Sequence, residues 1–181
     1  MAYQIISFLL DVAAGLLGGA CLLRLYMQYQ RIPFGNPVGR FIFALSDWLV
    51  LPLRKVLPAI GRVDTASVVA VYLVELAQFA LMSLVFGIAA YQMLPLLALF
   101  GVVRLALSAM VGLVIVYVIL SWVQADSPIS DVIDRLCVPL LRPWRRIVPV
   151  AKGIDFSPLV LLVVLQVLLI VLAYLQAEVL R

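Results

Sequence analysis

Residues 158–177 read PLVLLVVLQVLLIVLAYLQA, a mostly apolar stretch without a charged side chain. A helix of this length extends about 30 Å, which matches the hydrocarbon core of a lipid bilayer. Three further windows are also long enough and mostly apolar, at residues 3–25, 66–91 and 96–122, and each of them contains at least one charged residue. The first has neither the basic start nor the cleavage site of a secretory signal, so we expect it to be retained. The sequence therefore predicts an all-α membrane protein with four transmembrane helices.

The composition favours the same class of protein and excludes several chemistries. Of the 181 residues, 66% are hydrophobic and 12% are charged, whereas soluble proteins have about 45–50% and 25%. The chain has no histidine, which excludes histidine-ligated haem, histidine metal sites and histidine-based catalytic triads. Cys21 and Cys137 belong to no CxxC motif, so we interpret both as packing residues, with thiol chemistry at Cys137 as the alternative. No catalytic residue, cofactor, metal or small-molecule substrate is predicted, and an enzyme is the least favoured class.

The positive charges indicate an orientation. Of the 13 basic residues, 11 lie in residues 24–65 and 123–156, the two long loops that two spans separate. Basic loops stay in the cytoplasm, so both loops are predicted to be cytoplasmic and both termini to lie outside.

A shift of 91 positions reveals an internal repeat. It aligns residues 36–67 with 127–158 without a gap, and eight of the 32 positions are identical. Because an even number of spans separates the copies, they form two parallel repeats, predicted as residues 1–91 and 92–181. The shared loop motif is Pro-x-Arg-basic-x-x-Pro followed by Asp, and its members are Pro52, Arg54, Lys55, Pro58 and Asp64 in the first copy and Pro143, Arg145, Arg146, Pro149 and Asp155 in the second.

The basic loop motif has three possible ligands. Clustered Lys and Arg side chains near a membrane surface attract anionic lipid headgroups, and they can also hold a partner protein. Nucleic acid is the less favoured ligand, because the clusters are short, interrupted by prolines and accompanied by acids.

Each loop also begins with a helix signal. Asn36-Pro37 and Ser127-Pro128 place a capping side chain before a first-turn proline. The apolar residues that follow recur at helical spacing over about 13 residues, too few to span a bilayer. We expect two amphipathic helices, either in the membrane interface with Trp48 and Trp144 at headgroup depth, or packed on their own spans.

Four polar residues within the spans are candidate site residues: Asp11, Glu75, Arg104 and Gln166. Asp11 and Arg104 lie at nearly the same depth from the outer side and form the best-matched ion pair. Glu75 and Gln166 are related by the repeat and predict a polar seam between the two halves. The seam can be an ion or proton path, or it can be buried polar contacts that hold helices together.

Small residues predict one helix contact. Gly15 and Gly19 in the first span, and Gly101 and Gly112 in the third, lie on the faces of Asp11 and Arg104. Small residues permit close approach of helices, so these two spans are expected to touch.

The doubled loop motif resembles that of the YggT family, also called YlmG, over essentially the whole chain. The likeness rests on Asn36-Pro37 with residues 52–58, on Ser127-Pro128 with residues 143–149, and on Asp155-Phe156-Ser157-Pro158. The resemblance implies a small bacterial membrane protein linked to osmotic or extracytoplasmic stress, cation homeostasis or cell division. Plastid relatives imply roles in cytochrome assembly and nucleoid organisation.

These observations lead to two hypotheses. The first is a non-enzymatic protein of the bacterial inner membrane that supports envelope integrity or complex assembly. Its partners would be anionic headgroups and a membrane protein or a second copy of the chain. The second is a small ion channel or transporter that uses the four polar residues within the spans.

Overall fold

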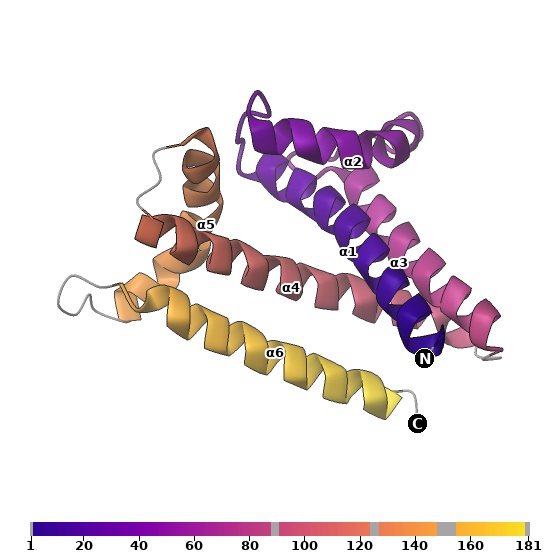
Figure 1. Cartoon of the computed structure of the whole chain (residues 1–181). Coiled ribbons are helices and arrows are strands. Elements are labelled where there is room, and N and C mark those ends of the chain that lie inside the picture. Colours follow the sequence, from indigo (N-terminus) through magenta and orange to yellow (C-terminus); the bar gives the residue numbers. More distant parts are fainter. Residues whose placement is uncertain (1, 88–90, 124–126, 148–154, 180–181) are drawn as a thin grey trace.

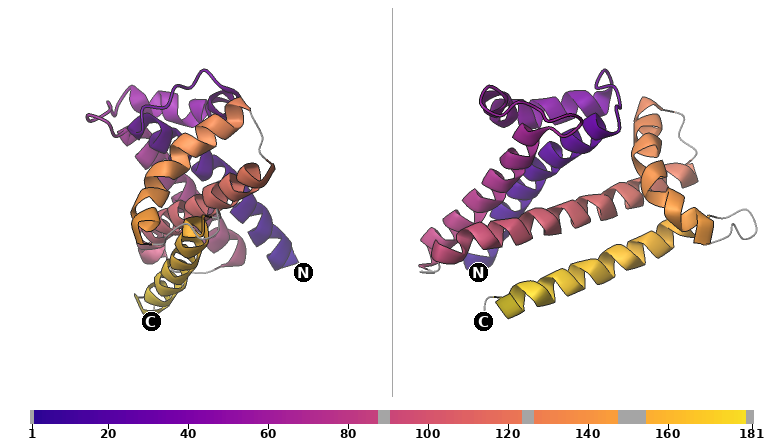
Figure 2. Two further views of the ribbon diagram at one scale, coloured as in Figure 1. Left: turned by 90° about the vertical axis from the view of Figure 1, so that its left-hand side faces the viewer. Right: turned by 180° about the vertical axis from the view of Figure 1, so that it is seen from behind.

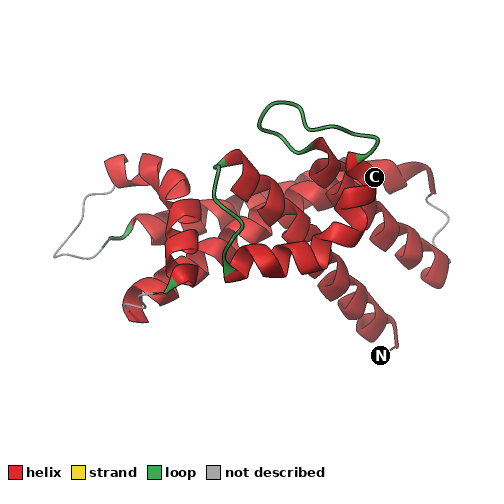
Figure 3. Ribbon diagram, turned by 90° about the horizontal axis from the view of Figure 1, so that it is seen from above, coloured by secondary structure: helices red, strands yellow, loops and turns green. Residues whose placement is uncertain are grey.

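The computed structural model describes residues 2–87, 91–123, 127–147 and 155–179. Within these residues the chain forms helices and loops without a named strand, as Figure 3 shows. The helices are α1 (Ala2–Tyr29), α2 (Pro37–Arg54), α3 (Thr65–Phe86), the short 3₁₀ helix η1 (Tyr91–Met93), α4 (Leu94–Val123), α5 (Pro128–Ile147) and α6 (Ser157–Val179). Four of them, α1, α3, α4 and α6, are long and apolar enough to cross a membrane. The predicted fold class is confirmed, and the chain is a multi-pass membrane protein.

The observed spans differ from the predicted windows at their ends. α1 continues to Tyr29 and α4 begins at Leu94, with Pro95 in its first turn, where the missing N–H has no helical partner to lose. α3 ends at Phe86 because Gly87 takes up a left-handed backbone conformation and donates its N–H to the Ser83 carbonyl. The window predicted to reach residue 91 was therefore too long.

The spans pack in the order α1, α3, α4, α6, with α1 also touching α4. Figure 1 shows α2 lying across the ends of α1 and α3, and α5 lying across the ends of α4 and α6. The beginning of α1 and the end of α6 lie at the opposite end of the molecule. Both loop helices therefore share one end, as a parallel repeat requires.

The two loop helices begin as their sequences predict. The Asn36 side chain accepts a hydrogen bond from the Gly39 N–H at 2.8 Å, and the Ser127 hydroxyl accepts one from the Ser130 N–H at 3.2 Å. The helices are 18 and 20 residues long, so the expected 13 residues were too few. Each helix continues through the motif proline, Pro52 or Pro143, near its end.

The loop helices pack on the spans of their own repeat, which confirms the second alternative for their inner faces. α2 buries Val50 against the α1–α3 pair and Ile42 between α1 and α5, while Phe41 and Trp48 remain exposed. α5 buries Ile133, Leu136, Cys137 and Leu141 among others. The exposed aromatic face of α2 is left for a membrane interface, where such side chains are favourable.

Three clusters of buried apolar side chains form the core. One lies within the first repeat around Cys21, Val50 and Val71, and one within the second around Val114, Leu141 and Leu165. The third joins the repeats through Met27 and Ile42 on one side and Val132 and Leu136 on the other. The Tyr26 hydroxyl also donates to the Leu136 carbonyl at 2.9 Å. The two halves thus have their own cores and a common apolar interface.

Candidate functional site

The structure brings together the Arg and the Asp of the loop motif in both repeats. In the first, Arg54 Nη2 lies 2.5 Å from Asp64 Oδ2. In the second, Arg145 Nε lies 2.8 Å from Asp155 Oδ2. We call each ion pair a clamp, because it ties the end of the loop helix to the start of the next span. Among the described residues, two of the four basic motif residues thus have an acidic partner.

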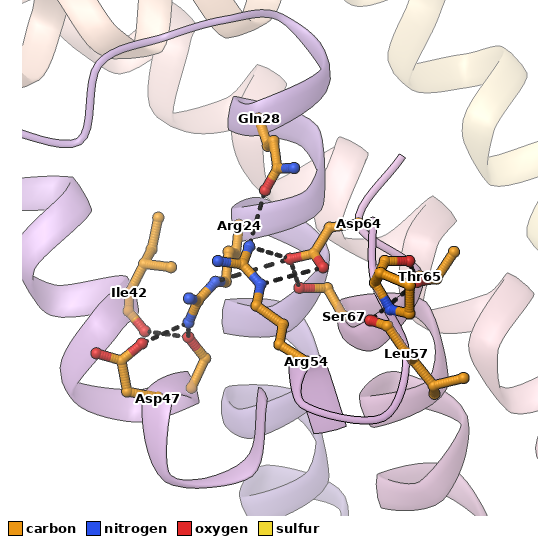
Figure 4. A network of polar contacts seen from close by, with 11 residues as sticks. Arg24, Gln28, Ile42, Asp47, Arg54, Leu57, Asp64, Thr65 and Ser67 are labelled. Carbon is orange, nitrogen blue, oxygen red and sulfur yellow. Dashed lines mark hydrogen bonds and ion pairs between the residues drawn. The ribbon is translucent and has the colours of Figure 1, made fainter. Parts of the chain in front are cut away.

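The first clamp is part of a larger buried network (Figure 4). Asp64 also accepts a hydrogen bond from the Ser67 hydroxyl at 2.7 Å, and its Oδ2 lies 4.0 Å from Arg24 Nε. Arg24, only 2% exposed, donates to the Ser46 hydroxyl at 2.9 Å and to Asp47 Oδ1 at 2.6 Å. α1, α2 and α3 therefore meet at one polar cluster, which the sequence did not predict because Arg24 reads as the basic end of a span.

The electrostatics of Asp64 follow from these contacts. Burial alone would raise the pKa of the Asp64 carboxyl, but hydrogen bonds from Arg54 and Ser67 and the charges of Arg54 and Arg24 outweigh it and lower the pKa. Asp64 is therefore ionised at neutral pH. The four charged side chains of the cluster, Arg24, Arg54, Asp47 and Asp64, have a formal sum of zero.

The second clamp is shallower. The Arg145 and Asp155 side chains are 37% and 28% exposed, against 36% for Arg54 and none for Asp64. Arg145 also donates to the Tyr117 hydroxyl at 2.8 Å, and Asp155 Oδ1 accepts from the Ser157 N–H at 2.9 Å. Burial opposes ionisation of Asp155, but its Ser157 and Arg145 partners lower its pKa. Asp155 therefore caps the start of α6.

The remaining motif residues have other environments. Lys55 and Arg146 are exposed next to their clamps. The Pro58 carbonyl accepts a hydrogen bond from the Thr65 hydroxyl at 2.8 Å, which closes the loop before α3. Pro52 and Pro143 are exposed. Pro149 lies outside the described residues.

The predicted pair of Asp11 and Arg104 does not form. Asp11 instead accepts a hydrogen bond from Gln78 Nε2 at 2.5 Å, joining α1 to α3. Arg104 is exposed on α4 and has no hydrogen bond or ion pair within the part of the chain that the structure describes. Equal depth in the membrane was not enough to identify the partner of Asp11. Gln78 lies within hydrogen-bonding distance of Asp11, but a search for oppositely charged residues overlooks it because it is neutral.

Glu75 is the one buried residue among the four polar candidates within the spans, at 2% exposed. Its Oε2 atom has no hydrogen-bond partner in the described ranges. The carboxylate packs against Gly101 of α4 so closely that a Cβ atom added at Gly101 would lie 2.1 Å from Oε2. Its repeat counterpart Gln166 is exposed on α6. Glu75 therefore contacts α4, and the structure shows no hydrogen bond that links it to Gln166.

The small residues contribute less than expected to the contact between α1 and α4. A Cβ atom added at Gly18 would lie 2.5 Å from Leu105 Cδ2, so these helices do touch there. An added Cβ atom at Gly15, Gly19 or Gly112 would meet nothing within 4 Å. The stripes of glycines are therefore not a close-packed seam.

The cysteines have structural surroundings. Both are free and buried, and the Cys137 thiol lies 3.5 Å from the Leu113 carbonyl, to which it donates. Burial, assisted by the charge of Asp134, raises the pKa of the Cys137 thiol to about 12. Among the residues with described positions, no three His, Cys, Asp or Glu side chains are placed to hold a metal ion.

Comparison with known proteins places this doubled arrangement in a family. The profile of the CCB3/YggT family matches residues 3–85 and again residues 96–176. The chain belongs to the CCB3/YggT family. The two matches include both clamps. They leave out the connecting residues 86–95 and the last residues of the chain. The resemblance found in the loop motif is thereby confirmed.

Several bacterial proteins are similar to this chain over most of their length. The uncharacterized protein YggT of Escherichia coli K12 is 37% identical over 90% of this chain and 86% of its own. An uncharacterized protein of Vibrio alginolyticus, encoded in the proC 3' region, is 32% identical over 88% of this chain and 89% of its own. No solved structure matches the chain at a significant level.

Proposed function

We propose that this CCB3/YggT-family chain is a non-enzymatic scaffold of the bacterial inner membrane that supports envelope integrity or complex assembly under osmotic stress. The observation that carries the proposal is the pair of clamps. In each repeat an Arg–Asp ion pair fixes an amphipathic helix at the same end of the bundle. A fixed helix with an exposed basic residue is a suitable platform for binding, because little conformational freedom is lost when a partner arrives.

The exposed cations support a cytoplasmic position for this end. Arg62 and Arg142 are exposed there in addition to Lys55 and Arg146. Basic residues close to the ends of spans are retained in the cytoplasm. They also attract anionic headgroups or acidic segments of a partner membrane protein.

Lys55 and Arg146 are the proposed contact residues, because they hold equivalent repeat positions and neither is used in a clamp. The test is charge reversal at both positions in one variant, Lys55→Glu with Arg146→Glu. The control is Arg40→Glu, a reversal at an exposed residue of α2 outside the motif. Cells that carry each variant are grown in high osmolarity, and membrane proteins that co-purify in mild detergent are identified.

The double variant should accumulate normally in the membrane, yet lose co-purifying proteins and stress tolerance, while Arg40→Glu retains both. If the double variant keeps its partners and supports growth as the wild-type protein does, the scaffold proposal fails.

One observation favours the second function, an ion channel or transporter. The unpartnered, buried Oε2 of Glu75 lies in a span near the Asp11–Gln78 pair, and buried carboxyl groups of this kind can carry protons or cations. Ion flux into liposomes distinguishes the two functions. A transporter should lose flux in Glu75→Gln and keep it in the Lys55/Arg146 double variant, whereas a scaffold should give no flux above empty liposomes.

A further inference from the structure

Independently of the proposed function, we propose that the groove between α1 and α4 binds the acyl chains of an anionic phospholipid from the leaflet next to α2 and α5. The lipid would fill the wedge between the two repeats. The inference rests on the shape and lining of the groove, on its length, and on the cations at its rim.

The groove lies where α1 and α4 separate. Figures 1 and 2 show these helices diverging toward the end of the molecule that carries α2 and α5. The groove has a volume of about 580 Å³ and lies between the second half of α1 and the middle of α4, with Ile133 of α5 contributing one wall. Its lining is apolar apart from the tyrosines Tyr26 and Tyr29. Such a lining is suited to hydrocarbon.

The length of the groove matches one leaflet. Along α1 its lining extends from Gly19 to Tyr29, which is about 15 Å at the rise of an α-helix. The hydrocarbon core of a bilayer is about 30 Å thick, so one leaflet contributes about 15 Å. The groove therefore offers an acyl chain a path from the headgroup region to the bilayer centre.

A flexible chain suits this space better than a helix does. The groove has a volume of about 580 Å³, and an α-helix with its side chains is about 10 Å across. Acyl chains are thinner and can follow the walls.

Two glycines keep the groove open. Gly19 of α1 and Gly112 of α4 both contribute to its lining. A Cβ atom added at either position would meet no other atom within 4 Å. The space in front of these residues is thus unfilled by protein, and a large side chain at either position would occupy it.

The rim of the groove has the chemistry of a headgroup region. Tyr29 and Val63 line its end and are 51% and 41% exposed. Tyrosine is favourable at headgroup depth. Arg62 directly precedes Val63, and Arg31 follows Tyr29 by two residues; both are exposed. Two exposed cations close in sequence to the residues that line the mouth of an apolar groove favour a lipid with a negatively charged headgroup.

The test measures lipid that stays with the protein during purification. The wild-type protein, Gly112→Leu and Gly15→Leu are purified in mild detergent from membranes that contain phosphatidylglycerol and phosphatidylethanolamine, and native mass spectrometry counts the bound lipids. Gly15 is the matched control, because a Cβ atom there is also unobstructed but the residue does not line the groove. Gly19→Leu fills the groove from α1 and is the second variant if Gly112→Leu does not fold.

The wild-type protein and Gly15→Leu should retain phosphatidylglycerol, while both groove-filling variants lose at least nine-tenths of it. Arg62→Ala with Arg31→Ala should retain lipid but lose the preference for phosphatidylglycerol by several fold. Equal retention in the groove-filling variants and the control would overturn the proposal. Equal retention of the two lipids by the wild-type protein would also overturn it. So would a disulfide between two copies of the Leu113→Cys variant, because Leu113 lines the groove.

Discussion

The two clamps occupy equivalent positions in the repeat, but their different burial predicts that the same substitution will have different effects. Asp64→Asn removes a fully buried negative charge. The positive charges of Arg54 and the buried Arg24 then have less negative charge nearby to balance them. Removing one partner of a buried ion pair costs about 3–5 kcal/mol. Asp155→Asn breaks an ion pair between two partly exposed side chains, and pairs of this kind contribute about 0–1 kcal/mol.

The free energy of unfolding of the two variants can be measured in detergent micelles by titration with a denaturing detergent and circular dichroism. Asp64→Asn should be less stable than Asp155→Asn by at least 2 kcal/mol, a rough lower limit from the same ranges. Each substitution is the control for the other, because the chemical change is identical. Equal losses of stability would refute the argument that the depth of the clamp determines its strength.

The pH dependence of the same variants provides an independent check. The pKa of Asp64 is lowered in the folded protein. Its stabilising contribution is therefore complete above the ordinary carboxyl pKa of about 3.9 and is lost as the pH falls through the lower folded pKa. The difference in stability between the wild-type protein and Asp64→Asn should stay constant from pH 7 to pH 5 and shrink only below about pH 4. A difference that decreases between pH 7 and pH 5 would contradict the lowered pKa.

Two further predictions concern buried groups. Cys21 and Cys137 are buried, and the pKa of the Cys137 thiol is raised to about 12. A maleimide at pH 7 should therefore label neither thiol in the folded protein and both after denaturation, which a gel shift can measure. Rapid labelling before denaturation would contradict this burial. Gly101→Ala should destabilise the protein by about 1–3 kcal/mol, because its Cβ would overlap the Glu75 carboxylate. In the double variant Gly101→Ala with Glu75→Ala, removal of the Glu75 carboxylate should relieve the loss of stability. Gly15→Ala is the control and should not destabilise the protein, because its Cβ would meet no neighbour. If the effects of the Gly101 and Glu75 substitutions on stability simply add, the two residues are not in contact.

The features that the sequence predicted well depend on local patterns or on the repeat. The spans follow from runs of apolar residues, and the caps of α2 and α5 follow from Asn36-Pro37 and Ser127-Pro128. The repeat identified the Arg and the Asp of both clamps. It gave no reason to pair them, since their separation of ten residues corresponds to no regular helical contact.

The features that the sequence did not predict depend on how the helices are rotated about their axes. Depth along a span can be counted from residue numbers, but the direction of a side chain around the bundle cannot. Asp11 therefore was matched by depth with Arg104, whereas α1 turns it toward Gln78. Likewise, Arg24 reads as a residue at a membrane boundary, yet α2 covers it.

The buried ion pair of the first clamp and the exposed basic residues of the motif respond differently to salt. Salt weakens attraction between exposed charges, with a screening length of about 8 Å at physiological ionic strength, but it weakens buried pairs much less. The Asp64 clamp is shielded by protein, while Lys55 and Arg146 face outward. A rise in the salt concentration of the surrounding solution should therefore weaken the contacts proposed for Lys55 and Arg146 and leave the buried ion pair of Asp64 intact.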